Sequence, residues 1–256
     1  MKYSTKKNPS VRTATIDFGR VSQRRHSIIG MIEVDITNAR ENVKASKKIS
    51  NISFNGWLVK SISDLLADHK QVAAYVRRKK KLFIFDDVTV SMVVEKNKDG
   101  LRIPVPLLIL SANKKSVEEI TEEIEIAKRK DLQKNEIILH QTMSFIMQIY
   151  IYLPPFIRRA IWRHMIKTPK LAYGRMGNVV ISSVGMMGNV NGWFIQSTIH
   201  PISFGIGSIT KKPWVVNGEI MIREILHITI LFDHDVVDGG EMARFVGALA
   251  KKLERG

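Results

Sequence analysis

Residues 233–254, DHDVVDGGEMARFVGALAKKLE, follow an apolar stretch and lead into an amphipathic one, a pattern that predicts a strand-to-helix junction. Polar side chains at such a junction can be presented rigidly to a cleft. Histidine exchanges protons near neutral pH, which makes His234 the candidate general base, and Asp238 can fix the local structure. The HxxxD spacing by itself favours a simpler interpretation, a satisfied histidine beside a helix-capping aspartate.

The same segment offers oxygen and nitrogen atoms to a metal ion, from Asp233, His234, Asp235 and Asp238. A metal site is the weaker interpretation, because the four residues lie in one short segment without a second cluster. Ligand spacing is also lacking around the other six histidines: His26, His69, His140, His164, His200 and His227. We therefore expect no metal.

The composition limits the chemistry. With 256 residues, 45% of them hydrophobic, the chain can bury a substantial core, and without internal repeats or a flexible linker we expect one domain. The absence of cysteine excludes disulfides, thiolate zinc sites, iron–sulfur clusters and a cysteine nucleophile. A reducing, cytoplasmic location is the simplest prediction, since the N-terminal residues also lack a signal-peptide pattern.

The net charge of +16 favours polyanionic partners without choosing among them. Nucleic acid is not expected, because the basic residues are spread along the chain and the run RRKKK at 77–81 matches no nucleic-acid motif. The most apolar stretch, 143–162, is broken by Pro154 and Pro155 and followed by arginine, so it is too short to span a bilayer.

Periodicity and turn residues predict the order of elements. Strands are expected at 28–37, 177–185, 202–209 and 223–234, an extended segment at 99–110, and helices at 38–47, 53–75, 116–130 and 240–254. Ser53 is a candidate N-cap, and Ser116 with Glu119 fits a capping box. A hairpin is expected around Asp86 and Asp87, and the basic N-terminus is expected to be loose. This order favours an α/β or α+β sheet covered by helices.

Several blocks together resemble one family. The stretch 233–254 is similar to DHRxxDGxxxARFLxxLxxxLE, the C-terminal signature of the catalytic domain of the 2-oxo acid dehydrogenase acyltransferases (the dihydrolipoamide acyltransferase family), and more distantly to the HHxxxDG motif of chloramphenicol acetyltransferase. Four further blocks agree in the family's order: FNGWLVKSISDLLADHKQVAAY (54–75), VTVSMVVEKNKDGLRIPVPLLILSANKKSVEEITEEI (88–124), NVVISSVGMMG (178–188) and PISFGIGSI (201–209). The resemblance covers the chain from about Gln23 onward.

The resemblance implies an α/β fold of the chloramphenicol acetyltransferase-like type, a mixed sheet covered by helices, assembled as trimers with each active site between two subunits. It divides the chain into a basic N-terminal arm at 1–22 and an acyltransferase catalytic domain at 23–256. An apolar helical insertion near 133–175 interrupts that domain.

It also implies roles. His234 would take the proton from the thiol of coenzyme A or a dihydrolipoyl group, and the thiolate would attack the thioester of the acyl donor. Ser182 would hydrogen-bond the developing oxyanion. Asp238 would hold the architecture of the site, paired with an N-terminal arginine such as Arg24 or Arg25. Coenzyme A is then a substrate, and a lipoylated protein is a candidate partner in trans.

The chain departs from the family pattern in four places. Asp235 stands where the family has arginine, and the sequence lacks the family's lipoyl and peripheral-subunit-binding domains. The insertion is longer and more apolar than its counterpart; two basic amphipathic helices hinged at the prolines are expected there, as core cover or trimer contact rather than as membrane-surface contact through 143–167. Met186, Met187 and Trp193 fit a packed wall better than an acyl pocket.

The leading hypothesis is therefore a coenzyme A-dependent acyltransferase acting on a thiol or other small acceptor. The alternative is a non-catalytic trimeric scaffold of the same fold, in which the altered DHDVVDG segment no longer supports catalysis.

Overall fold

The computed structural model describes residues 1–5, 12–47, 49–78, 80–98, 101–129, 149–183 and 191–256. Its main element is a mixed six-stranded sheet in the order β1 (Ser27–Asp35), β8 (Glu219–Asp233), β7 (Ile202–Val216), β6 (Val179–Ser182), β4 (Val90–Lys98) and β5 (Leu101–Ile109). The strand β6 runs parallel to β4 and to β7, and the other neighbours are antiparallel. The mixed sheet expected from the sequence is confirmed.

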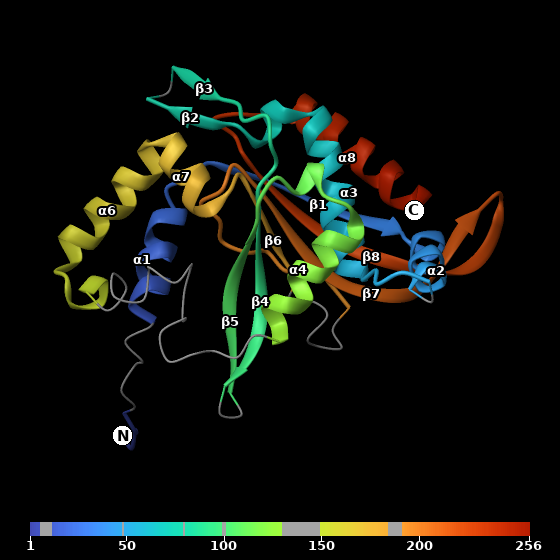
Figure 1. Cartoon of the computed structure of the whole chain (residues 1–256), viewed down its shortest axis with the longest axis horizontal. Helices are drawn as coiled ribbons and strands as arrows, with labels where there is room; N and C mark the ends of the chain where they lie inside the picture. The colour runs from blue at the N-terminus through green and yellow to red at the C-terminus, as the bar shows by residue number, and fades with distance from the viewer. Residues whose placement is uncertain (6–11, 48, 79, 99–100, 130–148, 184–190) are drawn as a thin grey trace.

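Helices cover one face of this sheet (Figure 1). They are α2 (Thr37–Ser46), α3 (Phe54–Asp68), α4 (Val117–Arg129) and α8 (Gly239–Arg255). The main core lies between these helices and the sheet, where Phe204, Phe232 and Phe245 are fully buried. The other face is partly covered by residues 191–198; the backbone of Phe194 comes within 2.7 Å of a β-carbon placed on Gly205. The sheet is thus held between two layers.

Local signals locate the helix starts. The Ser53 hydroxyl accepts a hydrogen bond from the Gly56 amide at 3.0 Å, which confirms the expected N-cap of α3. Ser116 and Glu119 exchange backbone and side-chain hydrogen bonds of 2.7 and 3.1 Å, which confirms the capping box of α4. These caps satisfy amide groups that the first turn of a helix leaves without a partner.

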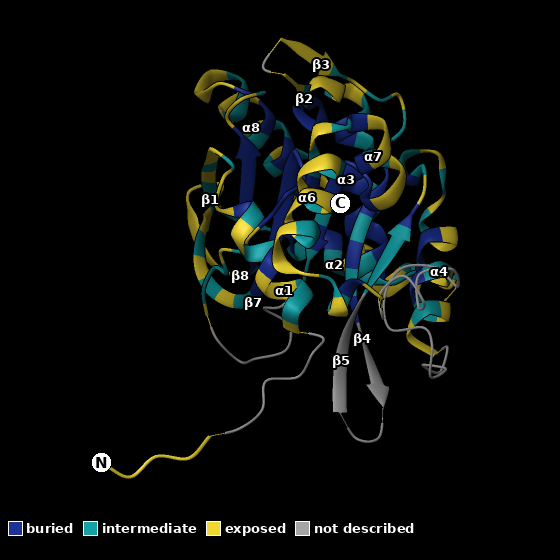
Figure 2. Cartoon of the chain, turned by 90° about the vertical axis from the view of Figure 1, so that its left-hand side faces the viewer, coloured by how far each residue is buried: buried dark blue, intermediate teal, exposed yellow. Residues whose placement is uncertain are grey.

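A second group of elements lies at one end of the molecule (Figure 1). It comprises α1 (Arg12–Ser22), α6 (Pro155–Lys167), α7 (Pro169–Met176) and the two-stranded sheet of β2 (Tyr75–Arg77) and β3 (Lys81–Phe83). A small core of its own holds them together, in which Phe18 contacts Trp162 edge to face and Phe85 stacks on Tyr173 at 3.9 Å. Exposed residues follow the outer surface of α6 (Figure 2).

Three expectations were wrong. Residues 12–22 form a helix rather than a loose end, because α1 packs on α6. The helix expected at 53–75 ends at Asp68 and gives way to a 3-10 turn, η1 (Lys70–Ala73), and β2. The hairpin lies between β2 and β3, around Arg78 with φ of 52°, instead of at Asp86 and Asp87. Asp87 instead binds Ser111 and Lys114, next to the 3-10 turn η2 (Ala112–Lys114), so it links two loops.

The apolar insertion is described only in part. Residues 149–152 are helical and α6 begins at Pro155, so the chain bends at the prolines as expected. Residues 130–148, which include His140, lie outside the described residues, as do Met186 and Met187. No helix in the described ranges is long and apolar enough to cross a membrane.

Gly56 allows α3 and α4 to pack closely, because a β-carbon there would lie 2.1 Å from Oγ1 of Thr121. We expect Gly56→Ala to lower the free energy of unfolding by about 1–3 kcal/mol through overpacking. The matched control is Gly247→Ala in α8, where nothing lies within 4 Å, and this change should raise the same quantity by up to about 1 kcal/mol. Urea unfolding of both variants measures these free energies. Equal changes in the free energy of unfolding for Gly56→Ala and Gly247→Ala would contradict the packing argument.

Burial lowers the pKa of His200 to about 4, despite its hydrogen bond to the Met176 carbonyl. Between pH 6.5 and pH 4, His200 is therefore protonated in the unfolded state but neutral in the folded state. We expect this group to remove about 3 kcal/mol of stability as the pH falls through that window. Urea unfolding at pH 6.5 and pH 4 measures how far the free energy of unfolding falls between these values. This fall should be about 3 kcal/mol smaller in His200→Gln than in the wild type. An equal fall in both proteins would contradict the prediction.

Candidate active site at the junction of β8 and α8

The turn after β8 is fixed on both sides. The His234 amide donates to the His26 carbonyl at 2.7 Å, which ties the turn to the residue before β1. The amides of Val236 and Val237 donate to the Asp233 carbonyl at 2.9 and 3.1 Å. The Val237 side chain is 1% exposed, so the turn is anchored in the main core.

This turn orients the His234 ring. The Nδ1 atom lies 3.0 Å from the Val237 carbonyl oxygen, which can only accept, so Nδ1 carries the hydrogen and donates it. The neutral ring then has its lone pair on Nε2. Among the described residues Nε2 has no hydrogen-bond partner, and His234 is exposed. The ring is therefore arranged as a base with an open acceptor atom.

Asp238 and Arg25 have roles different from the expected pair. The Asp238 carboxylate accepts from the Glu241 amide at 2.8 Å and caps α8. Arg25 pairs with Asp233, and their side chains are 12% and 5% exposed. The expected ion pair of Asp238 with Arg24 or Arg25 does not form among the described residues; Arg25 holds the residue before His234 instead. Since a buried carboxylate needs a partner, this ion pair also secures the turn.

Asp235, which replaces the family's arginine, lies with its carboxylate 3.1 Å from Nδ1 of His26. Their side chains are 46% and 71% exposed, and ion pairs so open to solvent contribute little.

Ser182 lies far from His234 in the same chain. It ends β6, and since Val179 and Ile181 face the helices, the Ser182 side chain points to the opposite face. Ser182 is aligned with Gly205 of β7, which is aligned with Thr229 of β8, five residues before His234. With about 3.3 Å per residue and about 4.8 Å per strand, the two Cα atoms are about 19 Å apart. One chain does not bring them together.

No group of three or more potential metal ligands occurs in the part of the chain that the structure describes. The four candidates of the His234 segment have other contacts: Asp233 with Arg25, His234 with the Val237 carbonyl, Asp235 with His26, and Asp238 with the start of α8.

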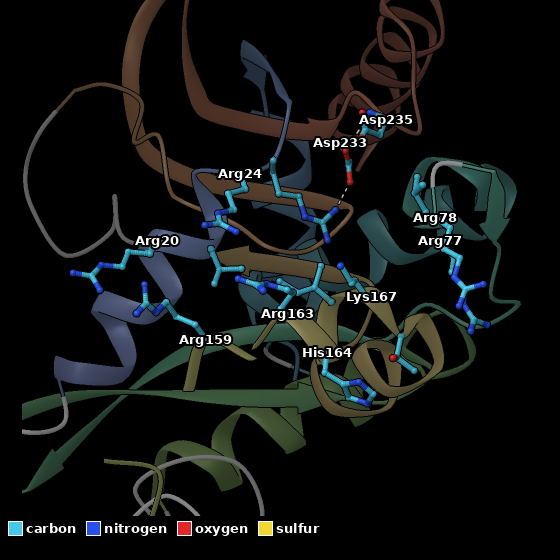
Figure 3. A pocket seen from close by; sticks show the side chains of 15 residues that line it. Arg20, Arg24, Arg77, Arg78, Arg159, Arg163, His164, Lys167, Asp233 and Asp235 are labelled. Carbon is cyan, nitrogen blue, oxygen red and sulfur yellow. Dashed lines mark hydrogen bonds and ion pairs between the residues drawn. The ribbon is translucent and has the colours of Figure 1, made fainter. Parts of the chain in front are cut away.

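A cavity of about 1010 Å³ adjoins the turn that holds His234 (Figure 3). Asp233 and Asp235 lie in its wall, and most of its other polar lining is arginine from α1 and the residues just after it, from α6 and from the β2–β3 hairpin. This cavity is not predictable from the sequence, although basic residues recur at 77–81 and 158–167. Three separate segments must come together to form it, and their spacing in the sequence does not reveal that.

The family model for the catalytic domain of 2-oxoacid dehydrogenases acyltransferases matches residues 21–141 and 166–255. The chain belongs to this family. A curated relative from Rickettsia typhi, the dihydrolipoyllysine-residue acetyltransferase component of the pyruvate dehydrogenase complex, is 24% identical over 86% of the chain and 46% of its own length. The chain thus spans about half the length of the curated relatives it matches.

Solved structures share the fold. The dihydrolipoamide acetyltransferase of Azotobacter vinelandii, on which the roles of a serine, a histidine and an asparagine in the mechanism were investigated, matches with a TM-score of 0.70 and 16% identity over 98% of this chain and 92% of its own. The cubic core of a pyruvate dehydrogenase multienzyme complex matches with 0.67 and 16% over the same shares. A chloramphenicol acetyltransferase matches with 0.51 and 10% over 98% and 99%. The expected fold class is confirmed.

Proposed function

We propose that the chain transfers an acyl group between coenzyme A and a thiol acceptor, with His234 as the general base. The observation that supports this most directly is the hydrogen bond from Nδ1 of His234 to the Val237 carbonyl, which leaves Nε2 open as the proton acceptor. Membership of an acyltransferase family gives this base its reaction.

The transfer needs one proton acceptor and one donor to an oxyanion. Nε2 of His234 takes the proton of the acceptor thiol, and the sulfur attacks the carbonyl carbon of the acyl thioester. The oxyanion is stabilised by the hydroxyl of Ser182. When the intermediate collapses, the carbon–sulfur bond of the donor breaks and the leaving thiolate regains the proton from His234. No cysteine of the enzyme is required.

The separation of about 19 Å within one chain means that Ser182 must come from a second copy, so the proposal includes self-association. Exposed apolar side chains at the tip of the β7–β8 hairpin favour such contact: Val215, Ile220 and Ile222 are 67%, 78% and 75% exposed. The similar fold of a cubic core also supports a homotrimer or larger assembly.

Residue spacing supports the assignments as well. In the Azotobacter enzyme the investigated serine precedes the histidine by 52 residues, and the asparagine follows it by four. Ser182 precedes His234 by 52 residues, and Asp238 follows it by four. Asp238 acts on the reaction through the turn, by holding the start of α8.

A dihydrolipoyl group on a partner protein is the proposed acceptor, since the relatives are named as a dihydrolipoyllysine-residue acetyltransferase component and a lipoamide acyltransferase component. The coenzyme's phosphates suit a chain of net charge +16. A cytoplasmic location stays a prediction.

The alternative is a scaffold of the same fold without catalysis. Asp235 favours it, because a carboxylate replaces the family's arginine beside the base. Replacing His234 separates the two functions.

We expect His234→Ala to lower kcat for transfer from acetyl-coenzyme A to dihydrolipoamide by about 100-fold or more, as for a lost general base. The mass in solution and the thermal unfolding should stay unchanged, because the ring lies outside the core and its hydrogen bond among the described residues is to Val237 in its own turn. Equal rates for both proteins would favour the scaffold.

Ser182→Ala should lower kcat with little change in KM for coenzyme A.

Sharing of each site by two copies predicts complementation. When His234→Ala and Ser182→Ala chains are co-expressed with different tags and the mixed assembly is purified, some interfaces combine an intact His234 with an intact Ser182. We expect this assembly to have a higher kcat than either variant alone, because each variant alone lacks one of the two groups at every site. Activity no higher than the two separate variants would contradict a site formed between chains.

A further inference from the structure

The cavity beside the His234 turn is strongly cationic. The cations in its wall that pair with no carboxylate of the described residues are Arg20, Arg24, Arg77, Arg78, Arg159, Arg163 and Lys167. Of the two carboxylates in the wall, Asp233 is paired with Arg25, whereas the exposed Asp235 lies 3.1 Å from Nδ1 of His26 and keeps its negative charge. His164 completes the titratable lining. These cations come from three separate segments, and Figure 3 shows Arg77 and Arg78 on the opposite side of the cavity from Arg20, Arg24 and Arg159.

The position of α6 is fixed by contacts behind the cavity. Asp17 of α1, 1% exposed, accepts from Nε of Arg158 at 2.7 Å and from the Tyr150 hydroxyl at 2.8 Å. The indole of Trp162 donates to the same hydroxyl at 2.8 Å. This network satisfies the charge of Arg158 inside the contact with α1. The cavity wall formed by α6 is therefore preorganised rather than dependent on a ligand.

The spacing of the other cations of α6 destabilises the helix. Arg159, Arg163 and Lys167 follow one another at four-residue intervals, so they lie on one face, and like charges at this spacing destabilise a helix. Arg20 and Arg24 face the same hollow from the neighbouring segment. Their mutual repulsion favours a bound anion that neutralises them.

Part of the lining lies outside the residues that match the family. The matched residues leave out 142–165, which contain Arg159 and Arg163, and they begin after Arg20. These three cations are features of this chain beyond the matched catalytic domain, whereas Arg24, Arg77, Arg78 and Lys167 lie within it.

We propose that the cavity binds a soluble ligand carrying a cluster of phosphate groups. Arginine predominates over lysine in the wall, and its planar fork suits bidentate contact with phosphate oxygens. A hollow of about 1010 Å³ suits a molecule of nucleotide size, whereas a membrane surface would meet a flat or convex patch. If the proposed function holds, the pyrophosphate and 3′-phosphate of coenzyme A are one source, and a free polyphosphorylated molecule is the other.

Calorimetric titration with inorganic pyrophosphate at 0.15 M salt tests the site. We expect saturable binding by the wild type and a loss of at least about tenfold in affinity for Arg159→Gln/Arg163→Gln, because charge-assisted hydrogen bonds are removed. The matched control is Lys44→Gln/Lys251→Gln, which removes the same charge from exposed positions on α2 and α8 and should bind as the wild type does. Thermal unfolding checks that each variant is folded.

Unchanged affinity in the α6 variant would overturn the proposal, and so would equal weakening in both double variants, since net charge alone would then explain binding. Sedimentation with phosphatidylglycerol vesicles but no binding of pyrophosphate would replace the soluble ligand by a lipid surface. Displacement of pyrophosphate by coenzyme A would identify the coenzyme as the source; no displacement would identify a separate phosphorylated ligand, with the site retained in both cases. His234→Ala should bind pyrophosphate normally, which separates this site from the transferase activity.

Discussion

The catalytic proposal depends on the short turn between β8 and α8 keeping one shape. The turn is held by burial of Val237, by the cap that Asp238 provides and by the ion pair of Asp233 with Arg25. The carbonyl that orients the His234 ring belongs to Val237. Because the Val237 side chain is anchored in the core, the imidazole is held in one orientation. A base on a flexible loop would spend most of its time in unproductive orientations. An exposed ring with a fixed proton position is the result.

The sheet register imposes a second constraint. Strands fix the positions of their side chains along and across the sheet, so no rotamer change can bring Ser182 to His234 across about 19 Å. An oxyanion donor also acts best where water is excluded, and His234 is exposed in the single chain. The proposed second copy would meet both requirements by supplying the serine and covering the ring. The protruding apolar tip of the β7–β8 hairpin is consistent with such a neighbour, because an isolated chain gains nothing from exposing Ile220 and Ile222.

Local chemistry made much of this structure predictable. The caps at Ser53 and Ser116, the strand before His234 and the helix after it follow from side chains within a few residues of one another. The errors involve distant partners. The pair of Arg25 and Asp233 joins residues 208 positions apart, so no periodicity signals it. The turn at Arg78 was missed because β2 and β3 have only three residues each, too few for a clear pattern.

Net charge shows the same limit of local reasoning. The sum of +16 does not tell which cations matter, because many are already used: Arg223 pairs with Asp35, Lys212 with Glu33 and Arg40 with Glu224. What separates the α6 cations from these is the buried pair of Arg158 and Asp17. With about 100° per residue, fixing Arg158 against α1 turns the residues one, five and nine positions later away from α1 and toward the cavity. A single buried carboxylate thus sets which charges of the helix are left for a ligand.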